Sequence, residues 1–136
     1  MSAVEGLIRS EADGTISFGD YTLPKKTKVS DFENAGDIYK VKSFKEITKL
    51  EKNEMFVYES VPGTAVSHLK QTAEGVEFQV EGLQDAQITV EMEAETVYSI
   101  EIDGEKTSEM KTNLSGKLSV SVELEEGKIV SVKVTK

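Results

Sequence analysis

The chain has 136 residues, a formal net charge of −9 and no cysteine. This length allows one domain or two very small ones, which excludes a large enclosed substrate cavity. The negative charge repels phosphate backbones and so disfavours a nucleic-acid partner, while the lack of cysteine excludes disulfides, thiolate metal sites and cysteine nucleophiles.

The opening residues, MSAVEGLIRSEADG, do not have the pattern of a signal peptide, which is a basic start followed by an apolar run. No stretch of the sequence approaches the ~20 apolar residues that a membrane span needs. We therefore expect a cytoplasmic protein with no membrane partner.

Residues 1–60 predict a small β-rich module with one or two short helices. The dipeptide Asp13-Gly14 predicts a hairpin turn between strands near residues 7–8 and 16–18. Further strands are expected at residues 38–42 and 55–60 from their apolar and aromatic content.

Two short helices are expected within this first part. In SDFENAG, a helical turn would begin at the Ser30 cap and end at Gly36. In SFKEITKLEKN, Ser43 and Glu46 have capping-box spacing, and Phe44, Ile47 and Leu50 would share one side of a helix.

Residues 61–136 predict a β-sandwich module, and the turn signal at Pro62-Gly63 places the boundary. Apolar residues alternate with polar ones in five segments, and glycine-containing turns separate them. The five expected strands lie at residues 76–80, 88–92, 98–102, 118–124 and 130–134. Short strands with this spacing are typical of a sandwich or a small barrel.

One segment in this half resembles a known family. Met92, Ala94, Thr96, Tyr98 and Ile100 follow the spacing L-x-P-x-T-x-Y-x-V, which resembles the tyrosine-corner segment of fibronectin type III and related immunoglobulin-like sandwiches. The resemblance implies that the Tyr98 hydroxyl ties a strand to a nearby corner and that Met92 and Ile100 fill the core. Ala94 replaces the usual proline, and two further strands are expected where a fibronectin module has one. We therefore expect an immunoglobulin-like sandwich, and its exact strand order stays open.

A second resemblance spans most of the chain. The segments VYESVPGTAV, FQVEG, QITVEMEAET and KTNLSGKLSVSVELEEG are similar to small bacterial proteins that carry the label endosialidase. The resemblance assigns no role to any residue. Sialidase-type sites hold the substrate carboxylate with several arginines, and this chain has only Arg9. We therefore expect no sialidase activity.

Lysines and aromatics gather in the first part of the chain. Residues 25–52 hold eight lysines against five acidic residues, and seven of the nine aromatics precede residue 61. Exposed aromatics stack on sugars or partner side chains, and lysines favour anionic or hydroxyl-rich ligands; the alternative is that these aromatics form the core. The candidate binding residues are Tyr21, Tyr39, Tyr58, Lys40 and Lys42. Neighbours such as Tyr39 and Lys40 point to opposite faces of a strand, so only one face can be used.

Catalytic signals are sparse. His68 is the only histidine, and its neighbour Ser67 would point to the other side of a strand. No phosphate-binding glycine loop and no calcium loop occurs, so we expect no cofactor and no metal. The leading interpretation is a non-catalytic binding module with a protein or carbohydrate partner. A carbohydrate-active hydrolase with a carboxylate pair and a structural subunit that self-associates through a strand edge stay open as alternatives, as does the oligomeric state.

Overall fold

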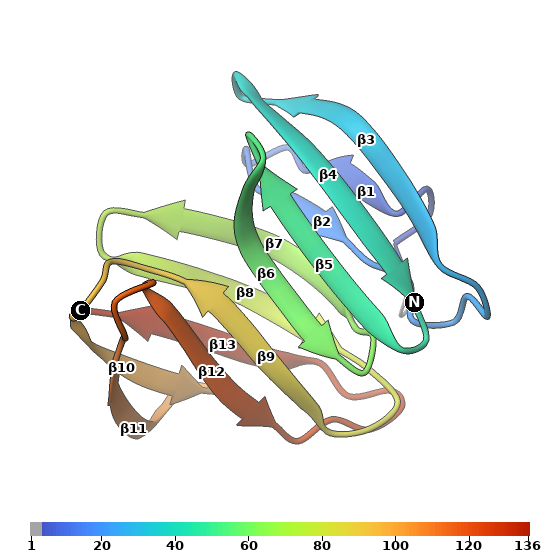
Figure 1. Cartoon of the computed structure of the whole chain (residues 1–136). Coiled ribbons are helices and arrows are strands. Elements are labelled where there is room, and N and C mark those ends of the chain that lie inside the picture. Colours follow the sequence, from blue (N-terminus) through green and yellow to red (C-terminus); the bar gives the residue numbers. More distant parts are fainter. Residues whose placement is uncertain (1–3) are drawn as a thin grey trace.

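Two antiparallel sheets pack face to face as a sandwich in the computed structural model, which describes residues 4–136 (Figure 1). The seven-stranded sheet contains, in spatial order, β1 (Ile8–Ser10), β2 (Ile16–Phe18), β7 (Ala65–Thr72), β8 (Gly75–Glu81), β13 (Val130–Thr135), β10 (Val97–Ile102) and β11 (Glu105–Lys111). The six-stranded sheet contains β12 (Lys117–Val122), β9 (Ala86–Glu91), β6 (Met55–Val61), β5 (Ile47–Lys52), β4 (Asp37–Phe44) and β3 (Thr27–Asn34).

Strands from both sides of residue 60 pair within both sheets. In the six-stranded sheet β6 lies between β5 and β9, and in the seven-stranded sheet β2 pairs with β7. Their inward side chains meet in one core, where the Tyr58 ring makes edge contacts with Phe18 and Phe78 at centroid distances of 5.3 and 5.5 Å. The expected boundary thus falls inside β6, in the middle of a paired sheet.

The strands predicted from alternation are confirmed. All five expected strands of residues 61–136 are present, as are the hairpin around Asp13-Gly14 and the strands at β4 and β6. Side chains on the apolar face of these strands are buried, and the examples are Val90, Tyr98, Ile100, Val120, Val122 and Val132. Alternation succeeds here because each of these strands has one face on the core.

The two short helices predicted at residues 30–36 and 43–50 are wrong: the described residues contain no helix. The first segment is a hairpin in which Ala35 and Gly36 both take positive φ, of 51° and 86°. Such a turn matches the twist of paired strands. In the second segment the Ser43 hydroxyl does not cap a helix. It is buried and shares a hydrogen bond of 2.8 Å with Thr48 on the next strand. Pairing along β3, β4 and β5 satisfies far more backbone groups than one helical turn would.

Two long strands are poorly predicted: β11 has no counterpart among the predicted elements, and β7 was expected only as the strand around Ser67 and His68. Every residue of β11 is exposed, so its sequence, EKTSEMK, has no apolar face to reveal. In β7 a bulge between Ser67 and Lys70 interrupts the register, and His68 takes a positive φ of 54° there. Both strands depend on pairing with β10 and β8 rather than on a local pattern.

Candidate functional site

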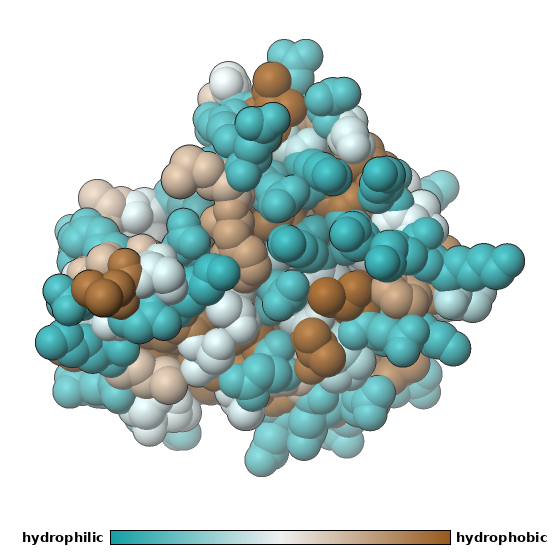
Figure 2. All heavy atoms as spheres, viewed as in Figure 1, coloured by the Kyte–Doolittle hydropathy of each residue, from teal (hydrophilic) through white to brown (hydrophobic). Residues whose placement is uncertain are grey.

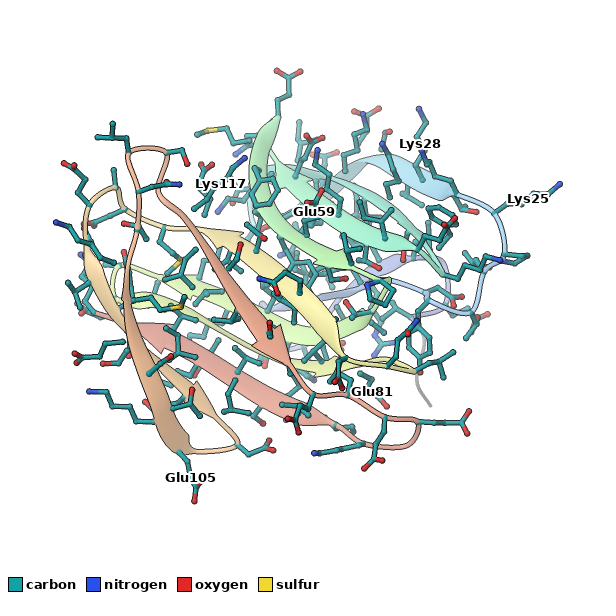
Figure 3. All side chains as sticks on the ribbon, turned by 60° about the horizontal axis from the view of Figure 1, so that its bottom comes forward. Lys25, Lys28, Glu59, Glu81, Glu105 and Lys117 are labelled. Carbon is teal, nitrogen blue, oxygen red and sulfur yellow. The ribbon has the colours of Figure 1, made fainter. Side chains whose placement is uncertain are left out.

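Three lysines stand side by side on the outer face of the six-stranded sheet. Lys28 on β3 is directly opposite Lys42 on β4, and Lys42 is directly opposite Lys49 on β5. Directly opposite residues lie on the same face with Cβ atoms about 4.5–5.5 Å apart. We call Lys28, Lys42 and Lys49 the lysine row. It is continued on β6 by Glu59, and Figure 3 labels Lys28 and Glu59 on this part of the sheet.

The lysine row is poorly neutralised. Within residues 4–136, neither Lys28 nor Lys42 has a carboxylate oxygen within 4.0 Å of its ammonium group. Lys49 has one such neighbour, Glu51, at 3.9 Å, and both side chains are about one-third exposed. An exposed pair at that distance contributes little, ~0–1 kcal/mol. Like charges placed directly opposite each other destabilise a sheet, so the row carries a cost to folding.

The outer face of the seven-stranded sheet is built in the opposite way. Across β7, β8, β13, β10 and β11 the directly opposite residues alternate in sign, and they are Lys70, Glu77, Lys133, Glu101 and Lys106. Each charge therefore has opposite charges as its cross-strand neighbours, which stabilises the sheet. The same chain thus balances charge on one outer face and stacks three lysines on the other.

A groove of about 740 Å³ lies beside the lysine row. Its lining residues are Ser30, Asp31, Ile38, Tyr39, Lys40, Glu51, Asn53 and Glu54. The groove coincides with a bulge in β3, where the register shifts between Val29 and Phe32 and Asp31 takes a positive φ of 59°. Bulges bend a strand and increase its twist, which opens the surface at this point.

An aromatic ring joins this surface. The Phe56 ring on β6 is partly exposed, and the ammonium groups of Lys117 and Lys49 lie 4.7 and 5.9 Å from its centroid. Phe56 was not among the candidates drawn from the sequence. A bulge between Leu50 and Glu51 shifts the register of β5 against β6 and sets Phe56 opposite Glu51. No sequence signal marks that bulge.

The five predicted site residues separate into two groups. Lys40 and Lys42 project from the outer face of β4, Lys40 into the groove and Lys42 in the lysine row. Tyr39 is 7% exposed and faces inward, although it also lines the groove, and burial raises the pKa of its hydroxyl. Tyr58 is fully buried in the core, and Tyr21 is buried outside the sheets, near Lys45 and Pro62. The structure therefore brings only Lys40 and Lys42 together on one outer face, and it leaves the three tyrosines buried, with Tyr39 reaching the groove from the inner side. Figure 2 shows mostly hydrophilic side chains over the face that carries the lysines.

The only histidine does not form a catalytic triad. The Nδ1 atom of His68 lies 3.1 Å from the Thr15 hydroxyl and 3.3 Å from a carboxylate oxygen of Asp13. In a nucleophile–base–acid triad the hydroxyl and the carboxylate bond to different ring nitrogens, whereas here both approach the same one. The Ser17 hydroxyl accepts a hydrogen bond of 3.1 Å from the backbone N–H of His68 and does not contact the imidazole ring. This cluster lies beside the charge-alternating face.

The carboxylates of this cluster are held as anions. The Ser17 hydroxyl donates to Glu11 and, with Arg9 at 2.9 Å, lowers the pKa of Glu11. The Thr15 hydroxyl, which donates to Asp13 at 2.5 Å, lowers the pKa of Asp13. A general acid of the glycosidase kind needs a raised pKa, so neither group suits that role. The single arginine is also committed to Glu11.

We expect Glu11 to make the fold sensitive to acid. Its pKa is lowered in the folded state, so its contribution is fully present above the ordinary glutamate pKa and is lost as the pH falls through the lowered value. The melting temperature of the wild type should therefore fall more steeply than that of Glu11→Gln as the pH drops below about 5. The matched control is Glu126→Gln, at an exposed turn, which should keep the wild-type slope. Equal slopes for all three proteins would contradict this role of Glu11.

Residues 4–136 contain no group of three or more histidine, aspartate or glutamate side chains placed to hold a metal ion. Nor do they contain a helix long and apolar enough to cross a membrane.

The fold and this surface define an all-β sandwich with an unbalanced cationic row on one outer face. Comparisons of the chain with protein-family models, with curated proteins and with solved structures gave no match.

Proposed function

We propose that the protein is a non-catalytic binding module that recognises an acidic partner through the lysine row. The observation that carries this proposal is the direct cross-strand stacking of Lys28, Lys42 and Lys49 without a carboxylate beside Lys28 or Lys42. An anionic ligand removes the repulsion between these ammonium groups on binding. The repulsion that destabilises the free protein is thus relieved in the complex, and this relief strengthens binding.

The overall charge of −9 does not prevent such binding. The Debye length is about 8 Å at physiological ionic strength, so exposed charges on remote faces are largely screened. A ligand at the lysine row responds mainly to the row itself and to the nearest acids, Glu51 and Glu59. The field at this face is therefore locally positive although the molecule is acidic.

The partner that fits best is an extended, carboxylate-rich protein segment. Alternate side chains of an extended strand are about 7 Å apart, twice the rise of about 3.4 Å per residue, and neighbouring strands of the sheet are about 4.8 Å apart. Flexible lysine side chains can bridge that difference. The partly exposed Phe56 ring and the adjacent groove offer apolar and polar contacts to the same segment. Aromatic anchors and complementary charge are typical of recognition surfaces.

Lys42→Gln should weaken binding and stabilise the fold at the same time. The variant removes the central ammonium group, so it removes repulsion with Lys28 and with Lys49. We expect the affinity for a fluorescent polyglutamate peptide to fall about tenfold, which corresponds to ~1.4 kcal/mol. The free energy of unfolding should rise by about 0.2–1 kcal/mol. Fluorescence anisotropy at about 0.1 M salt and urea unfolding measure the two effects.

The matched control is Lys128→Gln, which makes the same charge change in the connection between β12 and β13. It should leave both the affinity and the stability close to wild type. If Lys128→Gln weakens peptide binding as much as Lys42→Gln does, binding follows net charge and the assignment to the lysine row is wrong.

We infer further that the sandwich is of the immunoglobulin-like type. The Tyr98 side chain is buried, and its hydroxyl accepts a hydrogen bond of 3.1 Å from the backbone N–H of Glu93, five residues earlier. A bond of this kind, from a strand to the corner before it, is what a tyrosine corner makes. It supports the assignment of residues 92–100 to such a corner.

A further inference from the structure

The two sheets together have four edge strands, and three of them are protected. β3 and β11 each contain a register shift and several charged residues, and β1 has only three residues. Bulges, charges and short length are the usual ways in which proteins block pairing at a sheet edge. β12 is the exception. Its six residues pair with β9 without any irregularity, and Lys117 is its only charged residue.

The register shows which backbone groups of β12 face away from the sheet. The N–H of Met92 donates to the carbonyl of Gly116 at 2.7 Å, so this pair is hydrogen-bonded. Hydrogen-bonded and non-hydrogen-bonded pairs alternate in an antiparallel ladder. Residues 118, 120 and 122 therefore bond to β9, while Ser119 and Ser121 turn their N–H and C=O groups to the free edge. The N–H of Lys117 also points away from β9, because Asn113 Oδ1 accepts it at 3.2 Å.

A small hollow runs along this edge. A cavity of about 240 Å³ lies between β12 and the β10–β11 hairpin of the other sheet. Its apolar lining includes Ile100, Ile102, Met110 and Val120, and Met110 is 37% exposed. Figure 1 shows β12 at the rim of its sheet, with β10 and β11 of the other sheet to its left. A strand added to β12 would direct its inward side chains toward this hollow, as in strand-addition complexes.

We propose that β12 pairs antiparallel with β12 of a second copy of this chain. When the two-fold axis passes beside Val120, Leu118 is opposite Val122 of the second copy and Ser119 is opposite Ser121. The same register places Lys117 opposite Glu123, which is exposed just beyond the strand, and it does so twice because of the symmetry. The pairing therefore brings together opposite charges and no like charges, and the edge-directed groups of Ser119 and Ser121 meet each other.

The pairing extends the six-stranded sheet across both copies. Directly opposite residues of an antiparallel pair share a face, so both lysine rows would lie on the same side of the joined sheet. The dimer would thus offer two rows to one acidic partner, which raises avidity without any new contact. This last point rests on the proposed anion binding, whereas the pairing of β12 does not.

Sedimentation of the full chain over a range of concentrations tests the pairing. We expect a monomer–dimer equilibrium with a dissociation constant in the micromolar range, because one strand pair buries less than a standard interface of about 1,600 Å². Ser119→Pro removes one edge-directed N–H and leaves the ladder to β9 intact, since proline is tolerated on the free side of an edge strand. It should weaken dimerisation at least about tenfold at an unchanged melting temperature of the monomer.

Charge exchange tests the register even if the proline variant does not fold. Lys117→Glu and Glu123→Lys should each weaken dimerisation about tenfold, and the double variant should restore it. Glu123→Lys makes the chain less negative than its formal −9, so a loss of dimer in that variant is not explained by net repulsion. Lys111→Glu on the protected edge strand β11 should have no effect. A wild type that stays monomeric at millimolar concentration, or a double variant that does not recover, overturns the proposal. Peptide binding by the monomer is measured separately, so the two proposals can fail independently.

Discussion

Tyr58→Ala should lower the free energy of unfolding by about 3 to 5 kcal/mol, the cost of truncating a large aromatic in a packed core. The ring lies between Phe18 and Phe78 in the centre of the sandwich, with none of its surface exposed. Its hydroxyl shares a hydrogen bond of 2.8 Å with Thr64, which also bonds to Ser60. Truncation therefore leaves a cavity and removes a partner from a buried polar cluster. Urea unfolding measures the loss.

Two further variants separate the contribution of the lost hydroxyl from that of the lost ring. Tyr58→Phe keeps the ring and removes only the hydroxyl, so it should cost about 0.5 to 1.5 kcal/mol for the lost hydrogen bond, because Thr64 keeps its bond to Ser60. Phe56→Ala truncates an aromatic on the outer face of the same strand and should cost clearly less than Tyr58→Ala, because the Phe56 ring is partly exposed. If Tyr58→Ala and Phe56→Ala cost the same, Tyr58 is not the centre of the core.

The burial of Tyr58 also shows where sequence reasoning about the site reaches its limit. An aromatic in an apolar strand, such as Tyr58, carries no mark of which face it occupies once a bulge has shifted the register. The concentration of lysines between residues 25 and 52 did indicate a cationic region, and it includes all three members of the row. The direct opposition of Lys28, Lys42 and Lys49 could not be predicted, because it depends on the pairing of three strands.

The same dependence on strand pairing explains which strands of the fold could be predicted from the sequence. Strands such as β8 and β13 were predictable because one face is buried and the other is polar, which gives a period of two. The segment from Ser43 to Leu50 satisfies a local helix signal equally well, and only the pairing of β4 with β5 decides against it. In β11 no face is buried, so the local sequence holds no signal at all. Local patterns identified the strands with a clean alternation, whereas β5, β7 and β11 were decided by non-local pairing, although β5 and β7 also bury Leu50, Val66 and Leu69 in the core.

Gly75→Ala should be as damaging as a large core truncation although it adds a single methyl group. Gly75 begins β8 with a φ of +155°, and a Cβ at this position would lie 1.8 Å from the carbonyl oxygen of Val134. That oxygen belongs to β13, which pairs with β8 over six residues, so it cannot move without breaking the ladder. Overpacking of about 1–3 kcal/mol and backbone strain of about 1–3 kcal/mol add to a loss of about 2 to 6 kcal/mol.

Gly14→Ala is the matched control for this loss. Gly14 also has a positive φ, of +87°, but a Cβ there meets no atom within 4 Å. Its substitution should therefore cost only the backbone term, about 1 to 2 kcal/mol. Chemical denaturation of both variants compares strain with contact, because a Cβ meets β13 only at position 75, so a larger loss there reports mainly the clash with that strand. Equal losses for Gly75→Ala and Gly14→Ala would mean that β13 yields at this point and that the close approach of the two strands is not a rigid feature of the sheet.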